Sequence, residues 1–466
     1  MYEEKINAYF ADPKIEEQLI REASRLIRIR SVKGEPEPGK PFGPGPDAAL
    51  QEALKLCEEL GFAAENVGGY VGTADLNDKE TELHILTHLD VVGEGVGWTV
   101  TGPYEPKVVD GLLYGRGAID DKGPLVATLL AMKAVRELGL PVSKNVKLIM
   151  GTDEESGSGD LPHYFDTHPY APYTFTPDAE FPVINTEKGS YRPDFTKSWE
   201  KTDALPRVSA MKGGFRFNVV PPDAQATVLG MTAGEVRAIA DGVKNDTTYE
   251  ITSCEGGAQI LCKGVSCHAA FPWDGVNANS ALLELLAALP LAPCASTDTV
   301  RALHECFPHG DDYGEALGVA QSDEISGRLT FVFSVMEMDE TGFTGKCDSR
   351  TALTATDENC RLVVEKKLGG YGFTVEGEME EPHHVPSDSP FIKTLLRCYE
   401  QYTGLPGECI AVGGGSYVHH IPGGVAFGCK IPGFEPRMHA ADERMSVEHL
   451  LMAARIFTQA IAEICA

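Results

Sequence analysis

The sequence predicts an α/β protein in which a first domain, with a mostly parallel central sheet, is interrupted by an inserted α+β domain. Helical and strand patterns alternate over residues 1–189 and again over residues 386–466, which is typical of a parallel sheet with helical crossovers. Residues 190–385 show alternating strand patterns, typical of a separate α+β domain. The 466 residues are too many for one ordinary hydrophobic core, so at least two domains are expected.

The N-terminal segment begins with two predicted helices. Asp12 can cap the first helix, with Pro13 in its first position. Apolar residues then recur at helical spacing, namely Ile15, Leu19, Ala23, Leu26 and Ile27. A second helix is expected over residues 47–60, where Gly61 ends it.

Two predicted strands, residues 83–87 and 146–150, lie on either side of a predicted helix over residues 124–138. Ligands of parallel sheets gather beyond the carboxyl ends of the strands. His88 directly follows the first strand and Glu154 lies just after the second. We therefore expect both side chains at that edge of the sheet.

The inserted domain and the terminal segment follow. Strands are expected over residues 216–220, 225–229 and 328–334, and helices near Glu235 and Ser280. After Pro386, helices are expected over residues 391–402 and 447–464. The terminal segment carries His439, a candidate ligand, and is therefore expected to rejoin the first domain.

Composition excludes several kinds of partner. The formal net charge of −29 argues against nucleic acid and against an anionic membrane, which carry the same sign. We find no signal-peptide pattern after Met1 and no apolar stretch long enough to span a bilayer. The twelve cysteines include no CxxC pair and several follow helical apolar patterns, so a cytoplasmic compartment is expected.

Three dispersed stretches carry one imidazole and several carboxylates, the ligands that a pair of divalent cations needs. They are 88–90 (His-Leu-Asp), 120–123 (Asp-Asp-Lys-Gly) and 153–155 (Asp-Glu-Glu). In an extended segment His88 and Asp90 face the same way, so Asp90 could receive the second ring N–H of His88. For this pair alone, a strand-end histidine beside a turn aspartate is the commoner arrangement.

The other candidates also have ordinary alternatives. Asp120 could bridge two metals, but an aspartate there could equally be a helix N-cap, for which Asp121 fits better. Of Glu154 and Glu155, one could bind metal and the other accept a proton, although adjacent acidic residues are usually a solvated turn. Asp178 after a proline is commonly a turn residue, and a lone His439 is more often structural.

Taken in order, these pieces make the chain resemble the co-catalytic di-zinc metallopeptidase family that includes succinyl-diaminopimelate desuccinylase, acetylornithine deacetylase, aminoacylase and carnosinase. Within it, the chain looks most like the PepV-type bacterial dipeptidases. The most specific matches are THLDVV (87–92), YGRGAIDDKGP (114–124), GTDEESGS (151–158), PDAEFPV (177–183) and MHAADE (438–443). The resemblance spans nearly the whole chain and implies a zinc-exopeptidase-like catalytic domain.

The resemblance implies two divalent metal ions. Asp120 would bridge them, with His88 and Asp178 completing one shell, and Glu155 and His439 the other. Zinc is expected first, with manganese or cobalt as alternatives, because oxygen-rich shells with one histidine per ion accept all three. The implied activity is hydrolysis of the amide bond of dipeptides by attack of a metal-bridging hydroxide.

The resemblance also implies roles outside the metal shells. Glu154 would be the general base that later protonates the leaving amine, and Asp90 would orient His88. The inserted domain would be a lid, in which His268 stabilises the oxyanion. Asn218 and Arg350 would hold the ends of the substrate.

The glycine loop at residues 413–416, including Gly414, would lie near the substrate carboxylate. Relatives often place a small residue and an arginine after the Gly-Gly-Gly-Ser-Tyr run, where this chain has residues 418–420 (Val-His-His), and the match around Arg350 is loose. Substrate preference is therefore less well determined than the metal site. The long inserted domain implies a monomer, since a doubled lid would replace the partner subunit of dimeric relatives.

Two alternatives to a dipeptidase stay open. One is an amidohydrolase of the same fold acting on N-acyl amino acids, such as a deacylase or desuccinylase. The other is a metal-bearing binding or scaffolding protein that has lost catalysis; the presence of ligands, base and lid histidine together argues against it.

Overall fold

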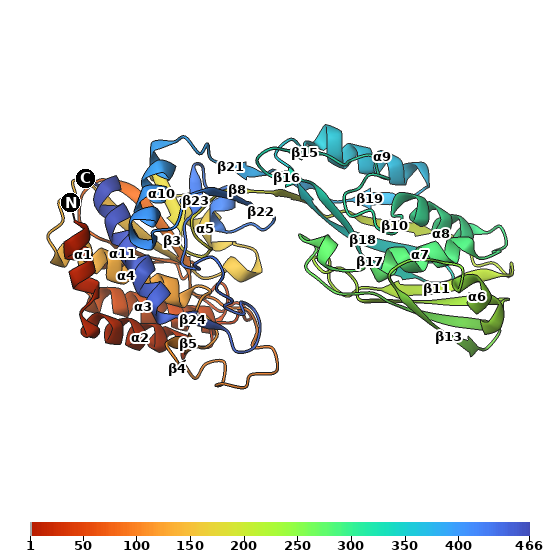
Figure 1. The fold of residues 1–466 in the computed structure, drawn as a ribbon, viewed down its shortest axis with the longest axis horizontal. Coiled ribbons are helices and arrows are strands. Elements are labelled where there is room, and N and C mark those ends of the chain that lie inside the picture. The colour runs from red at the N-terminus through yellow and green to blue at the C-terminus, as the bar shows by residue number, and fades with distance from the viewer. Residues whose placement is uncertain (1) are drawn as a thin grey trace. The chain divides into compact units, whose positions relative to one another are not determined.

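The computed structural model describes residues 2–466, which form two compact units. The first unit runs to Thr186 and resumes over His384–Ala411 and Gly415–Ala466. The second unit comprises Glu187–His383 together with Val412–Gly414. Figure 1 labels their elements.

The first unit is an α/β layer around a mixed sheet in the order β1-β2-β6-β3-β7-β23-β8. Its strands are β1 (Ala63–Val67), β2 (Val71–Asp75), β3 (Thr81–His88), β6 (Asn145–Gly151), β7 (Tyr173–Thr176), β8 (Val183–Glu187) and β23 (Gly424–Ala426). Short strands are β4 (Lys107–Val109), β5 (Leu112–Tyr114), β21 (His383–His384), β22 (Cys409–Val412) and β24 (Arg444–Ser446). Its helices are α1 (Glu3–Phe10), α2 (Pro13–Ile27), α3 (Pro44–Glu59), α4 (Lys122–Glu137), α5 (Asp160–Phe165), α10 (Pro390–Thr403) and α11 (Val447–Ile464).

The centre of this sheet is parallel, as predicted, and its margins are antiparallel. Strand β3 pairs in parallel with β6 and β7, and β7 with β23, whereas β1, β2 and β8 pair antiparallel with their neighbours. The register sets His88 opposite Gly151. The carboxyl ends of β3 and β6 therefore meet at one edge, which brings His88 next to the turn that follows Gly151.

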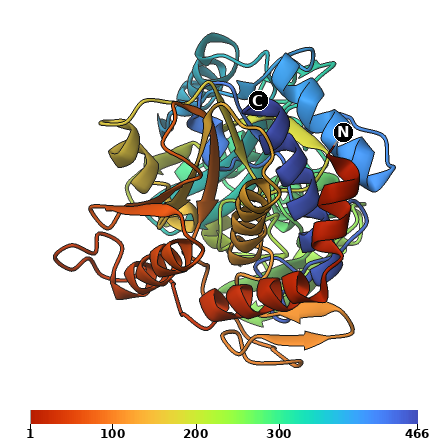
Figure 2. The ribbon, with the colours of Figure 1, turned by 90° about the vertical axis from the view of Figure 1, so that its left-hand side faces the viewer.

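Two apolar helices form the centre of the core beneath this sheet. Helix α4 is buried along most of its length and packs on α11. Phe175, Phe181 and Phe427 from the sheet side contact Phe457 of α11. Figure 2 shows the first helix, α1 (red), beside α11 (dark blue), so the two ends of the chain close the same layer.

The second unit is built on an antiparallel sheet in the order β13-β14-β12-β11-β17-β18-β10-β19. Its strands are β9 (Gly189–Tyr191), β10 (Asp194–Ser198), β11 (Arg207–Gly213), β12 (Asp223–Leu229), β13 (Thr248–Cys254), β14 (Gly257–Lys263), β15 (Ser322–Asp323), β16 (Gly327–Arg328), β17 (Thr330–Met338), β18 (Gly342–Thr351), β19 (Thr374–Glu376) and β20 (Met379–Glu380). Its helices are α6 (Ala233–Ala240), α7 (Ala278–Ala288), α8 (Ala295–Cys306) and α9 (Leu362–Gly370).

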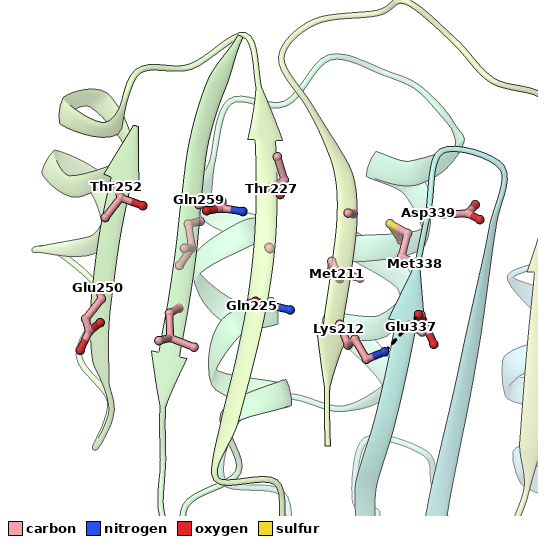
Figure 3. A pocket seen from close by; sticks show the side chains of 14 residues that line it. Met211, Lys212, Gln225, Thr227, Glu250, Thr252, Gln259, Glu337, Met338 and Asp339 are labelled. Carbon is pink, nitrogen blue, oxygen red and sulfur yellow. Dashed lines mark hydrogen bonds and ion pairs between the residues drawn. The ribbon is translucent and has the colours of Figure 1, made fainter. Parts of the chain in front are cut away.

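The two faces of this sheet differ. Inward side chains such as Ala224, Ala226 and Val228 are buried with α7, whereas alternate residues of the same strand face outward. The outward face forms a cavity of about 540 Å³ (Figure 3). Its lining mixes apolar residues with polar and charged ones, including Gln225, Gln259 and an exposed Lys212–Glu337 ion pair at 3.4 Å. This cavity lies on the sheet of the second unit and contains none of the predicted site residues.

Most predicted elements are present, but the strand predicted over residues 216–220 is wrong. Strand β11 ends at Gly213, and Gly214 takes a left-handed backbone with φ of +74°. The following residues form a turn whose one bridge joins Val219 to His268. The predicted cap is confirmed at the other end of the chain, where Asp12 accepts a hydrogen bond from the backbone N–H of Lys14 at 3.0 Å.

Two further expectations concern cysteines and membrane spans. All twelve cysteines are free thiols, and eight of them are buried. Among residues 2–466, no helix combines the length and the apolar character that a membrane crossing requires.

Candidate metal centre and active site

Five side chains of the first unit form two overlapping groups of metal-binding atoms. His88, Asp120 and Asp178 make one group, and Asp120, Glu155 and His439 the other; in each, the ligand atoms lie within 4.8 Å of one another. Asp120 is common to both, with Oδ1 2.8 Å from His88 Nε2 and Oδ2 2.8 Å from His439 Nε2. The structure thus brings together the five predicted ligands in the predicted partition, with one carboxylate facing both imidazoles.

The fold delivers these five ligands from five places. His88 is the last residue of β3, and Asp120 ends the loop that precedes α4. Glu155 lies in a single helical turn after β6, and Asp178 follows β7. His439 comes from the segment before β24, in a left-handed conformation with φ of +60°. The sheet edge therefore supplies three ligands (His88, Glu155 and Asp178), the loop before α4 supplies Asp120, and the returning C-terminal segment supplies His439.

The ligand atoms around His88 are arranged as they would be around a cation rather than as hydrogen-bond partners. His88 Nε2 is fully buried and lies 2.8 Å from one carboxylate oxygen and 3.4 Å from another, yet makes no hydrogen bond of acceptable geometry. Ring-nitrogen and carboxylate atoms that converge in this way, with no well-formed hydrogen bond from Nε2, are typical of ligands to a shared ion. The other ring nitrogen, Nδ1, lies 3.1 Å from the backbone oxygen of Asp90, which leaves Nε2 for the metal.

The electrostatics lead to the same assignment. Burial raises the pKa of the Glu154 carboxyl well above its usual range; the charge of His88 opposes this, and the neighbouring carboxylates add to it. Burial is also the main reason that the pKa of Asp178 is raised. Hydrogen bonds to Asp120 and Glu155 raise the pKa of His439 to about 11. Such a concentration of buried carboxylates needs positive charge, and bound cations would supply it in place of protons.

Asp90 makes a contact that sequence reasoning missed. Its Oδ1 accepts the backbone N–H of Glu154 and its Oδ2 that of Glu155, both at 3.1 Å. Its carboxylate also lies 3.5 Å from His88 Nδ1, close to the predicted orienting role. Asp90 therefore holds the turn that carries the candidate base and one ligand, in addition to facing the imidazole.

The suggestion that Asp121 caps a helix is wrong. Asp121 stands at the N-cap position of α4, but its side chain makes no capping hydrogen bond. Instead Oδ2 accepts the backbone N–H of His88 at 3.1 Å. The helix also begins at Lys122, two residues before the predicted start. The Asp121 side chain binds the end of β3 because both lie in the buried centre, where the backbone N–H of His88 needs an acceptor.

Like Asp90, Glu443 is an anchor, meaning a side chain that holds a ligand-bearing loop in place, and the sequence analysis did not single it out. Its Oε1 accepts the backbone N–H groups of Gly117 (2.9 Å) and Ile119 (3.3 Å), and its Oε2 lies 2.5 Å from Arg116. Both charged side chains are almost completely buried. Glu443 therefore ties the loop that delivers Asp120 to the segment that delivers His439. The sequence offered only the acidic end of MHAADE (438–443), and that run does not indicate which residue Glu443 would contact.

A third anchor joins the glycine loop to the turn after β6. Tyr417 donates its hydroxyl hydrogen bond to Asp160, whose Oδ2 also accepts the backbone N–H groups of Thr152 and Asp153 at 2.6 and 2.9 Å. The Tyr417 ring packs edge-on against His88, with centroids 6.2 Å apart. Position 151 must be glycine, because a Cβ there would lie 1.9 Å from the Tyr417 oxygen.

The remaining predicted residues belong to the second unit. Ala269, next to His268, donates its N–H to the backbone oxygen of Asn218 at 3.0 Å. Arg350 donates from Nε to Asp348 (2.9 Å) and from one terminal nitrogen to the backbone oxygen of Gly413 (2.7 Å), beside Gly414. Within this unit, the predicted residues thus form two hydrogen-bonded pairs, Asn218 with the segment of His268 and Arg350 with the glycine loop.

The family of the chain follows from comparison with known proteins. The model of peptidase family M20/M25/M40 matches residues 84–463, which include every metal-ligand candidate. The chain belongs to this family. It is therefore an M20 metallopeptidase, and the paired ligand groups lie in the part of the chain that the family model covers.

Relatives of this M20 chain match along almost its whole length. A Bacillus subtilis (strain 168) protein named "Putative dipeptidase YtjP" is 35% identical over 96% of this chain and 97% of its own. The Beta-Ala-Xaa dipeptidase of Lactobacillus delbrueckii subsp. lactis is 31% identical over 91% of this chain and 90% of its own.

Solved structures confirm the M20 fold. Human carnosine dipeptidase 1 superposes with a TM-score of 0.60 at 16% identity, covering 100% of this chain and 99% of its own. Aminoacylhistidine dipeptidase from Vibrio alginolyticus gives 0.58 at 14% identity, covering 97% and 96%. At these identities the likeness concerns the fold alone.

The shared position of Asp120 gives a prediction on metal content. The wild-type protein should bind about two divalent ions per chain. His88→Ala and His439→Ala should each reduce this to about one, because each removes a ligand of one group only, whereas Asp120→Ala should remove both. Each protein is loaded with zinc and dialysed to remove unbound metal, and metal analysis then gives the number of ions bound per chain. Equal occupancy in all four proteins would contradict the assignment.

The buried Arg116–Glu443 pair gives a prediction on stability. Glu443→Gln leaves the Arg116 guanidinium buried without its counter-charge, so the free energy of unfolding of the first unit should fall by about 3–5 kcal/mol. Urea unfolding followed by circular dichroism measures this. The matched control is Glu337→Gln, which breaks the exposed pair with Lys212 and should change stability little. A loss no larger than in the control would show that the pair does not anchor the loop.

Proposed function

We propose that this protein is a dipeptidase that hydrolyses the peptide bond of dipeptides with two bound divalent ions, zinc in the first place and manganese or cobalt as alternatives. The observation that carries the proposal is the carboxylate of Asp120 shared between two imidazole-containing ligand groups, with Glu154 in their electrostatic neighbourhood. Relatives named as dipeptidases, matched over nearly the full length of the chain, support the choice of substrate class.

The metal ligands would be His88, Asp178, Glu155 and His439, with Asp120 between the ions. Divalent ions supply Lewis acidity, which polarises a carbonyl and makes water more acidic. Oxygen and imidazole donors together suit zinc, manganese and cobalt, and metal availability decides among them.

Glu154 moves the proton in this proposal. Its carboxylate takes a proton from the attacking water and returns it to the nitrogen of the leaving amino acid, so that one residue acts first as base and then as acid. Its pKa is raised by burial among other carboxylates, and bound cations would oppose that rise and keep it ionised. Asp90 keeps the residue in place through the backbone N–H of Glu154.

The second unit supplies substrate recognition in this proposal. His268 donates a hydrogen bond to the carbonyl oxygen as it gains negative charge. Arg350 has one terminal nitrogen on the Gly413 carbonyl and its Nε on Asp348, which fixes the plane of its guanidinium for a terminal carboxylate. Asn218 and Gly414 complete the contacts with the substrate ends.

A monomer is part of the proposal. The sheet of the second unit consists of two four-stranded halves, β13-β14-β12-β11 and β17-β18-β10-β19, which meet where β11 pairs with β17. In a dimer, such a sheet could be made from one half contributed by each subunit. Here both halves lie in one chain, so no partner subunit is needed to complete the sheet. Light scattering coupled to size exclusion should give the mass of one 50.2 kDa chain, and a dimer mass would refute this part.

The substrate class is tested with a panel of matched compounds. The protein, loaded with zinc, manganese or cobalt, should cleave free-amine dipeptides at least about 100-fold faster, in kcat/KM, than N-acetyl or N-succinyl amino acids; that ratio corresponds to about 2.7 kcal/mol of transition-state discrimination. The reverse preference would make the protein an acyl amino acid amidohydrolase. Hydrolysis of neither class by protein with full metal content would favour a binding role.

The role of Glu154 gives a separate prediction. Glu154→Gln keeps the size of the side chain but removes the proton acceptor, so kcat should fall by about 10²–10⁴-fold while metal content stays that of the wild type. Steady-state kinetics and metal analysis on the same sample check this. Glu65→Gln, an exposed substitution in β1, serves as the control and should retain the wild-type rate. Unchanged kcat in Glu154→Gln would remove this residue from the mechanism.

A further inference from the structure

The backbone around His268 is tightly organised within the second unit. Val219 and His268 form a β-bridge, and hydrogen bonds from Ala269 N to Asn218 O and from Val220 N to Cys267 O lie on either side of it, both at 3.0 Å. A turn follows at once, because the N–H of Phe271 donates to the carbonyl of His268 at 2.9 Å. The main chain that carries the imidazole is therefore held on two sides.

Inside this turn, the backbone N–H of Ala270 donates to Nδ1 of His268 at 3.1 Å. A backbone N–H can only donate, so the Nδ1 atom that receives it must present its lone pair and carry no proton. Ala270 is buried, and within residues 2–466 its N–H makes no other hydrogen bond. A proton on Nδ1 would leave that N–H without an acceptor, an arrangement that folded proteins avoid.

We propose that the backbone N–H of Ala270 fixes the neutral His268 ring in the Nε2–H tautomer, so that His268 presents a single hydrogen-bond donor and no acceptor to the reacting carbonyl. Ala270 is thus a positioning residue that acts through His268. The role of the ring towards a substrate carbonyl rests on the proposed function, but the tautomer is a property of the free protein.

The charged groups around the ring favour the same neutral form. Burial lowers the pKa of His268, the positive charge of Arg350 lowers it further, and Asp348 opposes the shift. The Asp348 carboxylate is already bonded to two guanidinium groups, accepting from Arg192 Nε (3.0 Å) and Arg350 Nε (2.9 Å). Much of its negative charge is therefore compensated, which limits its ability to stabilise an imidazolium.

The tautomer has a chemical consequence. A neutral imidazole with its proton on Nε2 can donate a hydrogen bond that strengthens as the carbonyl oxygen becomes negative, and the proton stays on Nε2 throughout. The opposite tautomer would turn a lone pair towards the developing oxyanion and repel it. His268 therefore works as a fixed donor, and proton transfer is left to Glu154.

The experiment is ¹⁵N NMR of the histidine side chains in the full-length, zinc-loaded protein. The chain has 13 histidines, so the His268 signals are assigned by their loss in His268→Gln. We expect the Nδ1 resonance of His268 at the position of an unprotonated ring nitrogen and the Nε2 resonance at that of a protonated one, at neutral pH and without substrate. The reverse pattern, or the equal shifts of an imidazolium, overturns the proposal.

A second measurement tests the part played by Ala270. Ala270→Pro removes the N–H and also fixes φ at this position, whereas Ala270→Gly retains the N–H. The glycine variant should keep the wild-type ¹⁵N pattern. In the proline variant the two nitrogens should move towards averaged shifts, and kcat should fall by about 10-fold with KM nearly unchanged. An unaltered Nε2–H pattern in folded Ala270→Pro overturns the role of Ala270. If that variant does not fold by circular dichroism, the wild-type spectrum decides alone.

Failure of this inference and failure of the proposed function are distinguishable. A wild-type spectrum with the expected tautomer supports the inference whatever the protein hydrolyses. If His268→Gln in addition retains full dipeptidase activity, the oxyanion role of His268 is wrong while its tautomer stands.

Discussion

The carboxylates gathered at the edge of the first unit's sheet are the feature on which the rest of the structure depends. Within residues 2–466, the ligand groups bring Asp120, Asp178 and Glu155 together with two imidazoles, and Glu154 lies close enough for its pKa to be affected by them. Buried charges of one sign repel, and each has lost its hydration. Compensating positive charge would stabilise this arrangement, and divalent cations held by the two ligand groups of this M20 metallopeptidase would supply it.

Much of the surrounding structure serves to keep these groups from moving apart. Asp90 and Asp121 bind backbone N–H groups at the ends of β6 and β3, Glu443 binds those of the loop before Asp120, and Asp160 binds those of the turn before Glu154. In each case the carboxylate of a residue outside the ligand groups accepts the main-chain hydrogen bonds, so the ligand side chains do not have to. The anchors are themselves acidic, so the site keeps its negative charge while its backbone is immobilised.

The second unit shows the same use of fixed hydrogen bonds for a different purpose. Arg350 is held by Asp348 and by the Gly413 carbonyl, and His268 by the turn through Phe271 and by Ala270. Donors arranged in this way need little reorganisation when a substrate carboxylate or a developing oxyanion arrives. In the proposed mechanism, the first unit would hold the cations and carry out proton transfer, and residues of the second unit would recognise the substrate groups.

The sequence by itself determined the elements whose signals are local. Helix α11 and the cap at Asp12 could be read from apolar spacing and capping chemistry, and the five candidate ligands from motifs that resemble those of a known metallopeptidase family. Residues 216–220 have a strand-like pattern, yet Gly213 and Gly214 end the strand before them. Tertiary structure alone decided that Asp121 would bind the His88 backbone, that Glu443 would meet Arg116, and that Tyr417 would reach Asp160 past Gly151. These contacts join residues between 33 and 327 positions apart, and a side chain finds such a partner only once the sheet register has brought the two backbones together.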